Sequence, residues 1–324
     1  MEKAVQSKEK QFFTKKSNLL LMAILCTLLW GSAIPCMKLG YELFQIGTDD
    51  LFGKFMFAGY RFSFAGILTL LFGWIYNKKF PRLTKKNALP IIGLGLQYTG
   101  LQYLFFYIGV ANTTAVKSAI LTAMGTFIAV ILAHFFYKND RITPKKAVGC
   151  LIGFAGVVLI NLGGSLDASF SLQGEGFLFI AVFMFALGQL ISKKIAHLSD
   201  PVTITGYQLL SGGLMLVILG LCGGGRLHFN GASSAMLLLY MSSLSAVGFT
   251  VWTFLLKHNP MGSVAIYNFF TPIFGVFLSA IILHESVFSL KNIVALVLVC
   301  GGICLVNYQK KSKNIPATPV ENEA

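Results

Sequence analysis

The sequence has 324 residues, of which 55% are hydrophobic and 12% are charged, and its 26 lysines and arginines against 12 acidic residues give a net charge of +14. The charged fraction is about half that of an average soluble domain, too low to cover a water-exposed surface, so a lipid bilayer is the indicated environment. The cations lie in short clusters between apolar segments, as they do in membrane proteins, and we therefore expect no nucleic-acid partner.

Ten apolar segments approach the length of about 20 residues that a helix needs to cross the hydrocarbon core. Lipid offers the backbone no hydrogen-bond partner, and the segments lack the alternation of a membrane barrel, so each must be α-helical. The sequence therefore predicts an all-α polytopic membrane protein with ten transmembrane helices. In chain order, the segments are 19–40, 55–76, 88–110, 115–136, 147–162, 176–191, 203–221, 234–256, 262–283 and 290–308.

The lysines and arginines are divided unequally between the two sides of these segments. Most of them lie in the two tails and in the even-numbered loops, whereas Lys54, Arg226 and Lys291 lie in the opposite loops. Cytoplasmic loops carry the excess of positive charge in membrane proteins. We therefore expect a multi-pass protein of the cytoplasmic membrane with both tails, 1–18 and 309–324, in the cytoplasm.

The chain repeats itself with a step of 147 residues, which aligns the segment that starts at Asn112 with the segment that starts at Asn259. Because each repeat would hold five helices, an odd number, the second must cross the membrane in the opposite direction to the first. We therefore expect two inverted repeats, 19–165 and 166–308, around a central cavity. Inverted repeats are typical of secondary transporters, whose substrate binds near the membrane midplane where the halves meet.

Short motifs recur along the chain in a characteristic order. They are Leu29-Trp30-Gly31-Ser32 with Lys38, Tyr60-Arg61-Phe62, Asn112-Thr113-Thr114-Ala115, and Thr271-Pro272 with His284-Glu285. With glycine-rich fifth and tenth helices, they span 19–308 and resemble the EamA-type ten-helix members of the drug/metabolite transporter superfamily. Two positions depart from the pattern: Gly125 replaces a proline, and the acid at the end of the fourth helix is displaced to Asp140. The resemblance implies export or exchange of amino acids, other small metabolites or drugs.

Aromatic and amide side chains inside the segments are the candidates for a substrate-binding cavity. Tyr98 and Gln102 share one helix face, which lipid would tolerate poorly, and the repeat step places Trp252 opposite Phe105. A proline inside the ninth helix is expected to free a backbone carbonyl and permit a kink. Helix packing or interhelical hydrogen bonding is the alternative role for each candidate. The candidates are Trp30, Tyr98, Gln102, Gln189, Trp252, Tyr267 and Asn268.

Three cations lie inside or at the edge of helices. A charge as deep as Arg61 should face protein or water, so it is either an anchor for a substrate carboxylate or a packing arginine near the outer leaflet. Lys38 and Lys117 lie near the outer ends of the first and fourth helices. They either line an outer vestibule or extend to the membrane interface.

Other chemistry finds little support. The six cysteines form no paired motif, so we expect no disulfide, metal or cofactor site. His134 and the pair His284-Glu285 could carry protons, but their places near helix ends equally suit solvated or capping roles. Gly149, Gly153, Gly301 and Gly302 are expected to let the fifth and tenth helices approach closely.

The predicted function is therefore an alternating-access secondary transporter that exports or exchanges small metabolites such as amino acids. Protons or a counter-substrate could be its coupling partners, and it could be a monomer or a homodimer. The alternatives are a drug efflux carrier, and a channel or a non-transporting membrane scaffold. We expect no enzyme, because the acids lie almost entirely in loops or at helix ends rather than clustered within helices.

Overall fold

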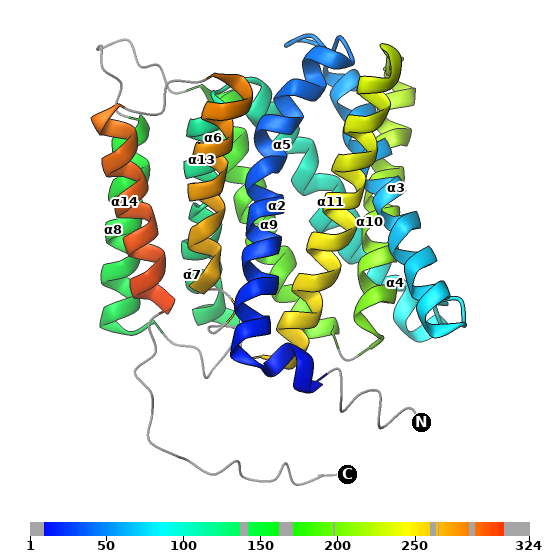
Figure 1. The fold of residues 1–324 in the computed structure, drawn as a ribbon, viewed down its shortest axis with the longest axis horizontal. Helices are drawn as coiled ribbons and strands as arrows, with labels where there is room; N and C mark the ends of the chain where they lie inside the picture. Colours follow the sequence, from blue (N-terminus) through cyan, green and yellow to red (C-terminus); the bar gives the residue numbers. More distant parts are fainter. Residues whose placement is uncertain are drawn as a thin grey trace, which may run out of the picture.

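The computed structural model describes residues 10–136, 142–161, 171–196, 198–259, 264, 266–284 and 289–307, and every regular element in this part of the chain is helical. The helices stand side by side in one bundle (Figure 1). The elements are α2 (Lys16–Leu43), α3 (Leu51–Asn77), α4 (Lys85–Gly95), η1 (Leu96–Leu101), α5 (Gln102–Ala111), α6 (Ala115–Thr122), α7 (Met124–Phe136), α8 (Pro144–Asn161), η2 (Leu172–Gly176), α9 (Phe177–Ile195), α10 (Pro201–Cys222), α11 (Gly231–His258), η3 (Ile266–Phe269), α13 (Phe270–Leu283) and α14 (Leu290–Asn307).

Several of these elements run directly into one another. The π-helix η1 joins α4 to α5, only Ala123 separates α6 from α7, and η2 and η3 lead into α9 and α13. Each resulting helical stretch overlaps one of the predicted segments. Six stretches of the described chain are long and apolar enough to cross a membrane, and the shorter α13 and α14 are also apolar. The protein is therefore an all-helical, polytopic membrane protein.

The two ends of the bundle carry different charges. We call the end where α2 begins and α14 ends the proximal end, and the opposite end the distal end (Figure 1). The exposed cations Lys15, Lys16, Lys78, Lys85 and Lys194 lie at or next to helix termini of the proximal end. The positive charge predicted for one side of the membrane therefore gathers at the proximal end.

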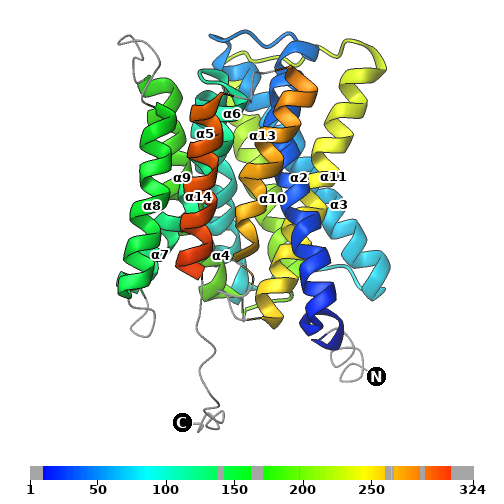
Figure 2. The same ribbon diagram turned by 60° about the vertical axis from the view of Figure 1, so that its left-hand side comes forward.

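Glycine allows helices to approach closely, as two interfaces show. At the interface of α3 and α10, a Cβ on Gly66 would lie 2.6 Å from the backbone nitrogen of Leu210. At the edge of the bundle, α8 pairs with α14 in both ribbon views (Figures 1 and 2). There a Cβ on Gly302 would lie 2.6 Å from the carbonyl oxygen of Gly149, whereas one on Gly301 would meet nothing within 4 Å. The predicted glycine contact is confirmed for this pair but is wrong for Gly301.

The structure corrects two sequence-based expectations. Lys54 is not in a loop, because α3 begins at Leu51; the lysine is 2% exposed, and its ammonium donates a hydrogen bond to the carbonyl of Thr48. Pro272 is not in the middle of a helix, because α13 begins at Phe270, directly after the 3-10 helix η3, and the proline lies in its first turn. The first N–H groups of a helix have no intrahelical partner, so a proline is tolerated there.

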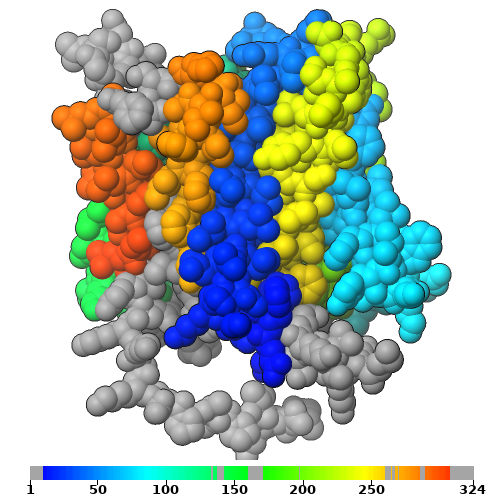
Figure 3. Space-filling view, in the orientation of Figure 1, coloured from blue at the N-terminus to red at the C-terminus, as the bar shows by residue number. Residues whose placement is uncertain are grey.

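Some predicted features lie outside the described residues. These are Asp140, Glu285, most of the repeated motif at 259–265, and the outer parts of both tails, 1–9 and 308–324. The face formed by α13, α2 and α11 is fully described over these helices, and α2 packs between the other two (Figure 3).

Candidate functional site

A cavity of ≈ 210 Å³ lies inside the bundle. Since one water takes about 30 Å³ of the liquid, the cavity has room for a small molecule rather than for a few waters only. Its walls come from both halves of the chain, namely α2, α3, α5, α6 and α7 on one side and α9, α11, η3 and α13 on the other. Lys146 and Val306 at the proximal end also line it. The cavity therefore extends from the middle of the bundle toward the proximal end.

Arg61 marks the deep limit of the cavity. It lies ten residues into α3 from Leu51, which is about 15 Å from the distal end at 1.5 Å per residue. Its side chain is 2% exposed. Nε donates hydrogen bonds to Ser245 Oγ at 3.0 Å and to the carbonyl of Met241 at 3.3 Å, and Nη1 donates to the Tyr107 hydroxyl at 3.2 Å.

Two aromatic rings also hold the Arg61 guanidinium. Its central carbon lies 4.7 Å from the ring centroid of Phe62 and 5.9 Å from that of Tyr103. All of these partners are neutral, so hydrogen bonds and aromatic faces hold the cation without neutralising its charge. The Arg61 side chain therefore packs between helices and also lines the cavity.

Gln102 lies at a depth similar to that of Arg61 on the facing stretch. It follows the π-helix η1, and π-helical turns are rare and often occur at functional sites. The side chain is 4% exposed, and its carbonyl oxygen Oε1 has no hydrogen-bond partner in the described structure. A buried amide oxygen without a partner is costly, and Gln102 is one of the residues that line the cavity.

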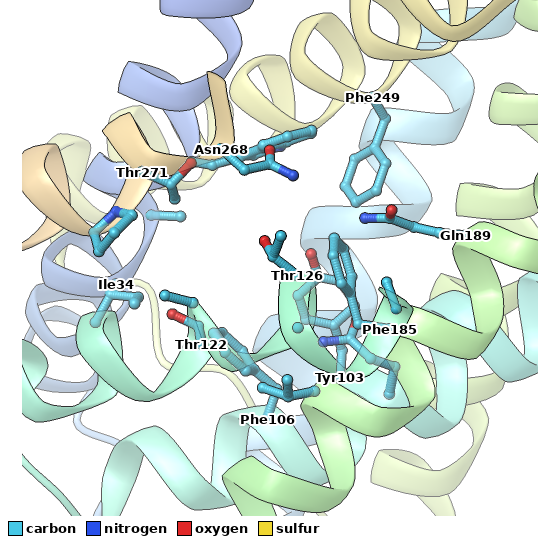
Figure 4. A pocket seen from close by; sticks show the side chains of 18 of the residues that line it. Ile34, Tyr103, Phe106, Thr122, Thr126, Phe185, Gln189, Phe249, Asn268 and Thr271 are labelled. Carbon is cyan, nitrogen blue, oxygen red and sulfur yellow. The ribbon is translucent and has the colours of Figure 1, made fainter. Parts of the chain in front are cut away.

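Two further amides face each other across the cavity. Figure 4 shows Asn268 reaching in from η3 and Gln189 reaching in from α9, with Phe249 beside Gln189. Thr271 lies next to Asn268, and the hydroxyls of Thr122 and Thr126 line the opposite wall. The wall thus mixes donors and acceptors with apolar surface.

Trp30 lines the cavity from α2 and belongs to an aromatic group with α11. Its ring centroid lies 4.9 Å from that of Trp252 and 5.7 Å from that of Phe249, both in edge-on arrangement. The indole N–H of Trp30 has no acceptor in the described structure. It is a second unsatisfied polar group at the cavity, of the opposite kind to the oxygen of Gln102.

The structure brings five of the predicted residues together and leaves five others outside the cavity wall. Trp30, Arg61, Gln102, Gln189 and Asn268 line the cavity. The ring of Tyr98 lies behind it, 5.4 Å from Phe185 and 6.0 Å from Phe249. The others are Trp252, packed against Trp30; Tyr267, next to the Leu19–Val264 cluster; and Lys38 and Lys117 at the distal end.

The sequence analysis missed several lining residues. Thr122 and Thr126 are four residues apart, as are Phe185 and Gln189, and such spacing puts each pair on one helix face. That spacing was a usable signal, although hydroxyl and phenyl groups are ordinary in membrane helices. Lys146 was counted only as a loop cation.

The charges around the cavity have one sign. Arg61 and Lys146 line it, and no carboxylate is among the described lining residues. On its distal side, the rings of Phe57 and Tyr107 lie 5.8 Å apart and that of Tyr41 lies within 6.3 Å of each. The arrangement is therefore compatible with a small molecule that carries a negative charge, polar groups suited to amides, and an apolar part.

Comparison with known proteins agrees with this architecture. Residues 18–162 and 172–308 match the model of the EamA-like transporter family. An uncharacterized transporter of Archaeoglobus fulgidus is 28% identical over 84% of this chain and 90% of its own length. The uncharacterized transporter YetK of Bacillus subtilis is 27% identical over 87% of this chain and 84% of its own length.

Two further similarities extend the comparison. A WAT1-related chloroplastic protein of Arabidopsis thaliana is 26% identical over 86% of this chain and 67% of its own length. A solved crystal structure superimposes with a TM-score of 0.67 over 90% of this chain and 96% of its own, at 15% identity, which shows a shared fold. With the family matched along most of its length, this chain belongs to the EamA-like transporter family and is a multi-pass membrane transporter.

Proposed function

We propose that this protein is an alternating-access carrier that exports or exchanges small metabolites bearing a carboxylate and an apolar part, such as neutral amino acids. The observation that carries this proposal is Arg61, a buried cation at the deep limit of the cavity whose described partners are all neutral. An ionisable residue inside a membrane protein is costly, and it faces a water-filled cavity or a substrate path.

The unused hydrogen-bonding capacity of Arg61 supports a carboxylate ligand. A guanidinium has five N–H groups, and the described bonds engage only the Nε and Nη1 nitrogens, so Nη2 is available to a ligand. Charge-assisted bonds between arginine and a carboxylate are stronger than neutral ones. The aromatic walls of Trp30, Phe106 and Phe185 would receive the apolar part of the substrate.

The pattern of helix contacts supports the inverted repeats, 19–165 and 166–308. Each helical stretch of one half has a counterpart at the same place in the other half, and the contacts between halves match when counterparts are exchanged. Thus α2 packs against α11 and α13, and its counterpart α9 packs against α5 and α7. In the same way, α3 contacts α11 as α10 contacts η1, and the pairs α3–α10 and α8–α14 map onto themselves. Two halves whose helix pairings exchange in this way can rock about the cavity between them.

The distribution of charge supports an orientation in which the proximal end of the cavity faces the cytoplasm. Positive charge marks the cytoplasmic side of a membrane protein, so the lysine-rich proximal end would face the cytoplasm and the chain would lie in the cytoplasmic membrane. The cavity would then be open to the cytoplasm, ready to take up a metabolite for export. In this orientation both tails would be cytoplasmic.

Two alternatives predict different behaviour. A carrier of cationic drugs would bring a positive charge to a cavity that already holds Arg61 and Lys146, and the like charges would repel it. A channel would conduct without needing substrate on the opposite face of the membrane. Counterflow and competition by organic cations therefore separate these alternatives from the proposed carrier.

The test is a ligand screen followed by transport. Purified protein is first heated with single amino acids and related carboxylates, because a true ligand raises the apparent stability by mass action. Ligands that raise it are then loaded into proteoliposomes, and uptake of the labelled compound is measured. We expect internal substrate to accelerate uptake of external substrate. An uptake rate that does not depend on internal substrate, or uptake that only organic cations inhibit, would contradict the proposal.

A further inference from the structure

A polar cluster at the distal end closes the bundle beyond the aromatic rings. Glu175 in η2 is its centre: the carboxylate forms an ion pair with Lys117 of α6 and accepts the backbone N–H of Ser171 at 2.9 Å. The Thr113 hydroxyl lies 3.5 Å from the same carboxylate, at the limit of a hydrogen bond. The ammonium of Lys38 donates to the backbone carbonyl of Thr113. Glu175 lies one residue before the sixth segment that the sequence predicts, 176–191, and is therefore not among the predicted site residues.

This cluster joins the two halves of the chain. Lys38, Thr113 and Lys117 belong to the first half and Glu175 belongs to the second, so the ion pair is a contact between halves. Glycine brings the backbones together beside it: a Cβ on Gly174 would lie 2.7 Å from the carbonyl oxygen of Asn112. At this end, the two halves are therefore joined by an ion pair and by a close backbone contact at a glycine.

The burial of Glu175 makes a partly separated pair unfavourable. Glu175 is 6% exposed and the Lys117 side chain 23%. When the two charges are paired, each compensates the other. When they are separated and both reach water, each is hydrated. A charge that is separated from its partner but still buried is strongly unfavourable. A contact of this kind favours fully closed or fully open arrangements over intermediate ones.

We propose that Lys117 and Glu175 form a distal latch, a pair of charged residues that holds the distal end shut and must separate once in every transport cycle. This inference rests on the alternating-access function proposed above. Separation of the latch would let water and substrate reach the cavity from the distal side while the proximal end closes. The latch residues contact neither the cavity nor the substrate, so they act on the switch and not on binding.

The test measures the width of the distal end directly. Spin labels are placed at Glu42 and Leu172, which are exposed ends of α2 and η2 on opposite halves, in a background whose six cysteines are replaced. Their distance distribution is recorded in liposomes by pulsed electron resonance, without added substrate. We expect Glu175→Gln to raise the ratio of wide to narrow distances about tenfold, an equilibrium shift of about 1.4 kcal/mol.

Matched variants separate a latch from a residue that only stabilises the fold. Asp49→Asn removes an exposed acid at the same end and should leave the distances unchanged. The exchanged pair Lys117→Glu with Glu175→Lys should restore the narrow population, because the attraction is re-formed with reversed charges. If Glu175→Gln does not yield a monodisperse protein, Lys117→Gln gives the same measurement, since it breaks the same pair.

The outcomes are decisive for the latch and for the carrier separately. A wider distal end in the neutralised variants, narrowed again by charge exchange, supports the latch. Wild-type distances in the neutralised variants, together with normal wild-type counterflow, would overturn the latch alone. Absence of counterflow from the wild-type protein with every ligand that stabilises it would overturn the proposed function.

Discussion

The two ends of the bundle close in different ways, although the same two halves meet at both. At the distal end, the ion pair of Lys117 with Glu175 joins the halves, and the rings of Tyr41, Phe57 and Tyr107, which all belong to the first half, pack edge-on against one another. At the proximal end, the cavity extends out to Lys146 and Val306. The repeat step of 147 residues places Val264 opposite Lys117, and Val264 is fully buried in an apolar cluster with Leu19, Ala23 and Trp252.

The two kinds of contact respond differently when the end that they close is opened. An apolar contact loses stability gradually as its surface is exposed, because the hydrophobic effect scales with area. A buried ion pair resists partial opening and is stable only when closed or fully hydrated. A transporter whose distal end closes by an ion pair and whose proximal end closes by apolar contacts can remain open to the proximal side until a ligand favours the arrangement that is open to the distal side.

The largest effect is expected from Arg61→Gln, which removes the charge at the deep limit of the cavity. There Arg61 contacts Tyr107, one of the three rings (Tyr41, Phe57 and Tyr107) that we call the distal seal. Each hydrogen bond to a charged group contributes about 1.5–3 kcal/mol, so we expect substrate affinity to fall by about 100-fold. The measurement is the half-saturating concentration of counterflow in proteoliposomes. Arg82→Gln, which changes an exposed arginine at the proximal end, is the matched control and should behave as wild type.

Phe57→Ala should open the distal seal from its aromatic side. Phe57 is fully buried between the rings of Tyr41, Phe44 and Tyr107. Removal of a buried phenyl ring costs about 3–5 kcal/mol, and the loss falls on the state in which the ring is packed. We expect modification of a cavity cysteine from the distal side to accelerate about tenfold.

Phe64→Ala is the control for that experiment, because Phe64 is 44% exposed on the same helix. It should leave distal modification unchanged. Equal acceleration in the two variants would mean that α3 is loosened in general and that no distal seal exists.

Asn268→Ala should weaken binding moderately without changing the sidedness of the cavity. The amide reaches into the cavity from η3 (Figure 4), and a neutral hydrogen bond contributes about 1 kcal/mol, so we expect about a fivefold loss of affinity. Asn230→Ala, at an exposed asparagine of the distal end, is the control. An unchanged affinity in the Asn268 variant would remove η3 from the binding site.

The smallest effect is expected from Lys146→Gln at the proximal mouth. Lys146 lines the cavity, whereas its neighbour Lys145 is exposed and does not line it. A cation at the mouth attracts an anionic substrate through screened electrostatics, so its loss should slow substrate entry about twofold at low salt and less at high salt. Lys145→Gln should have no such effect, and equal effects would point to general surface charge.

Sequence patterns predicted the elements of this fold better than the site. The segment 115–136 was placed at the same bounds as α6 and α7 together, because apolar length alone defines it. The fifth and sixth helices are longer than predicted, since Lys145, Lys146 and Glu175 are helical residues that their charge had assigned to loops. Polarity identifies where a chain leaves the membrane only when polar side chains do not pair or line a cavity.

The site was predicted where a polar residue had no other reason to be inside the membrane. Arg61, Gln102 and Asn268 are of this kind, and all line the cavity. Aromatic residues were less predictable, because Tyr98 and Trp252 pack against rings that themselves form the wall. Which of two neighbouring rings faces the cavity depends on contacts between distant helices, and one sequence does not contain that information.

The most direct test of the two-ended account is the modification rate of a cysteine placed at Thr122, a cavity residue on α6. A membrane-impermeant thiol reagent is added to either face of proteoliposomes made with the cysteine-replaced background. The account predicts that, without substrate, modification from the proximal face is about tenfold faster than from the distal face, and that a counterflow substrate raises the distal rate. Equal rates from both faces, or a faster distal rate without substrate, would contradict it.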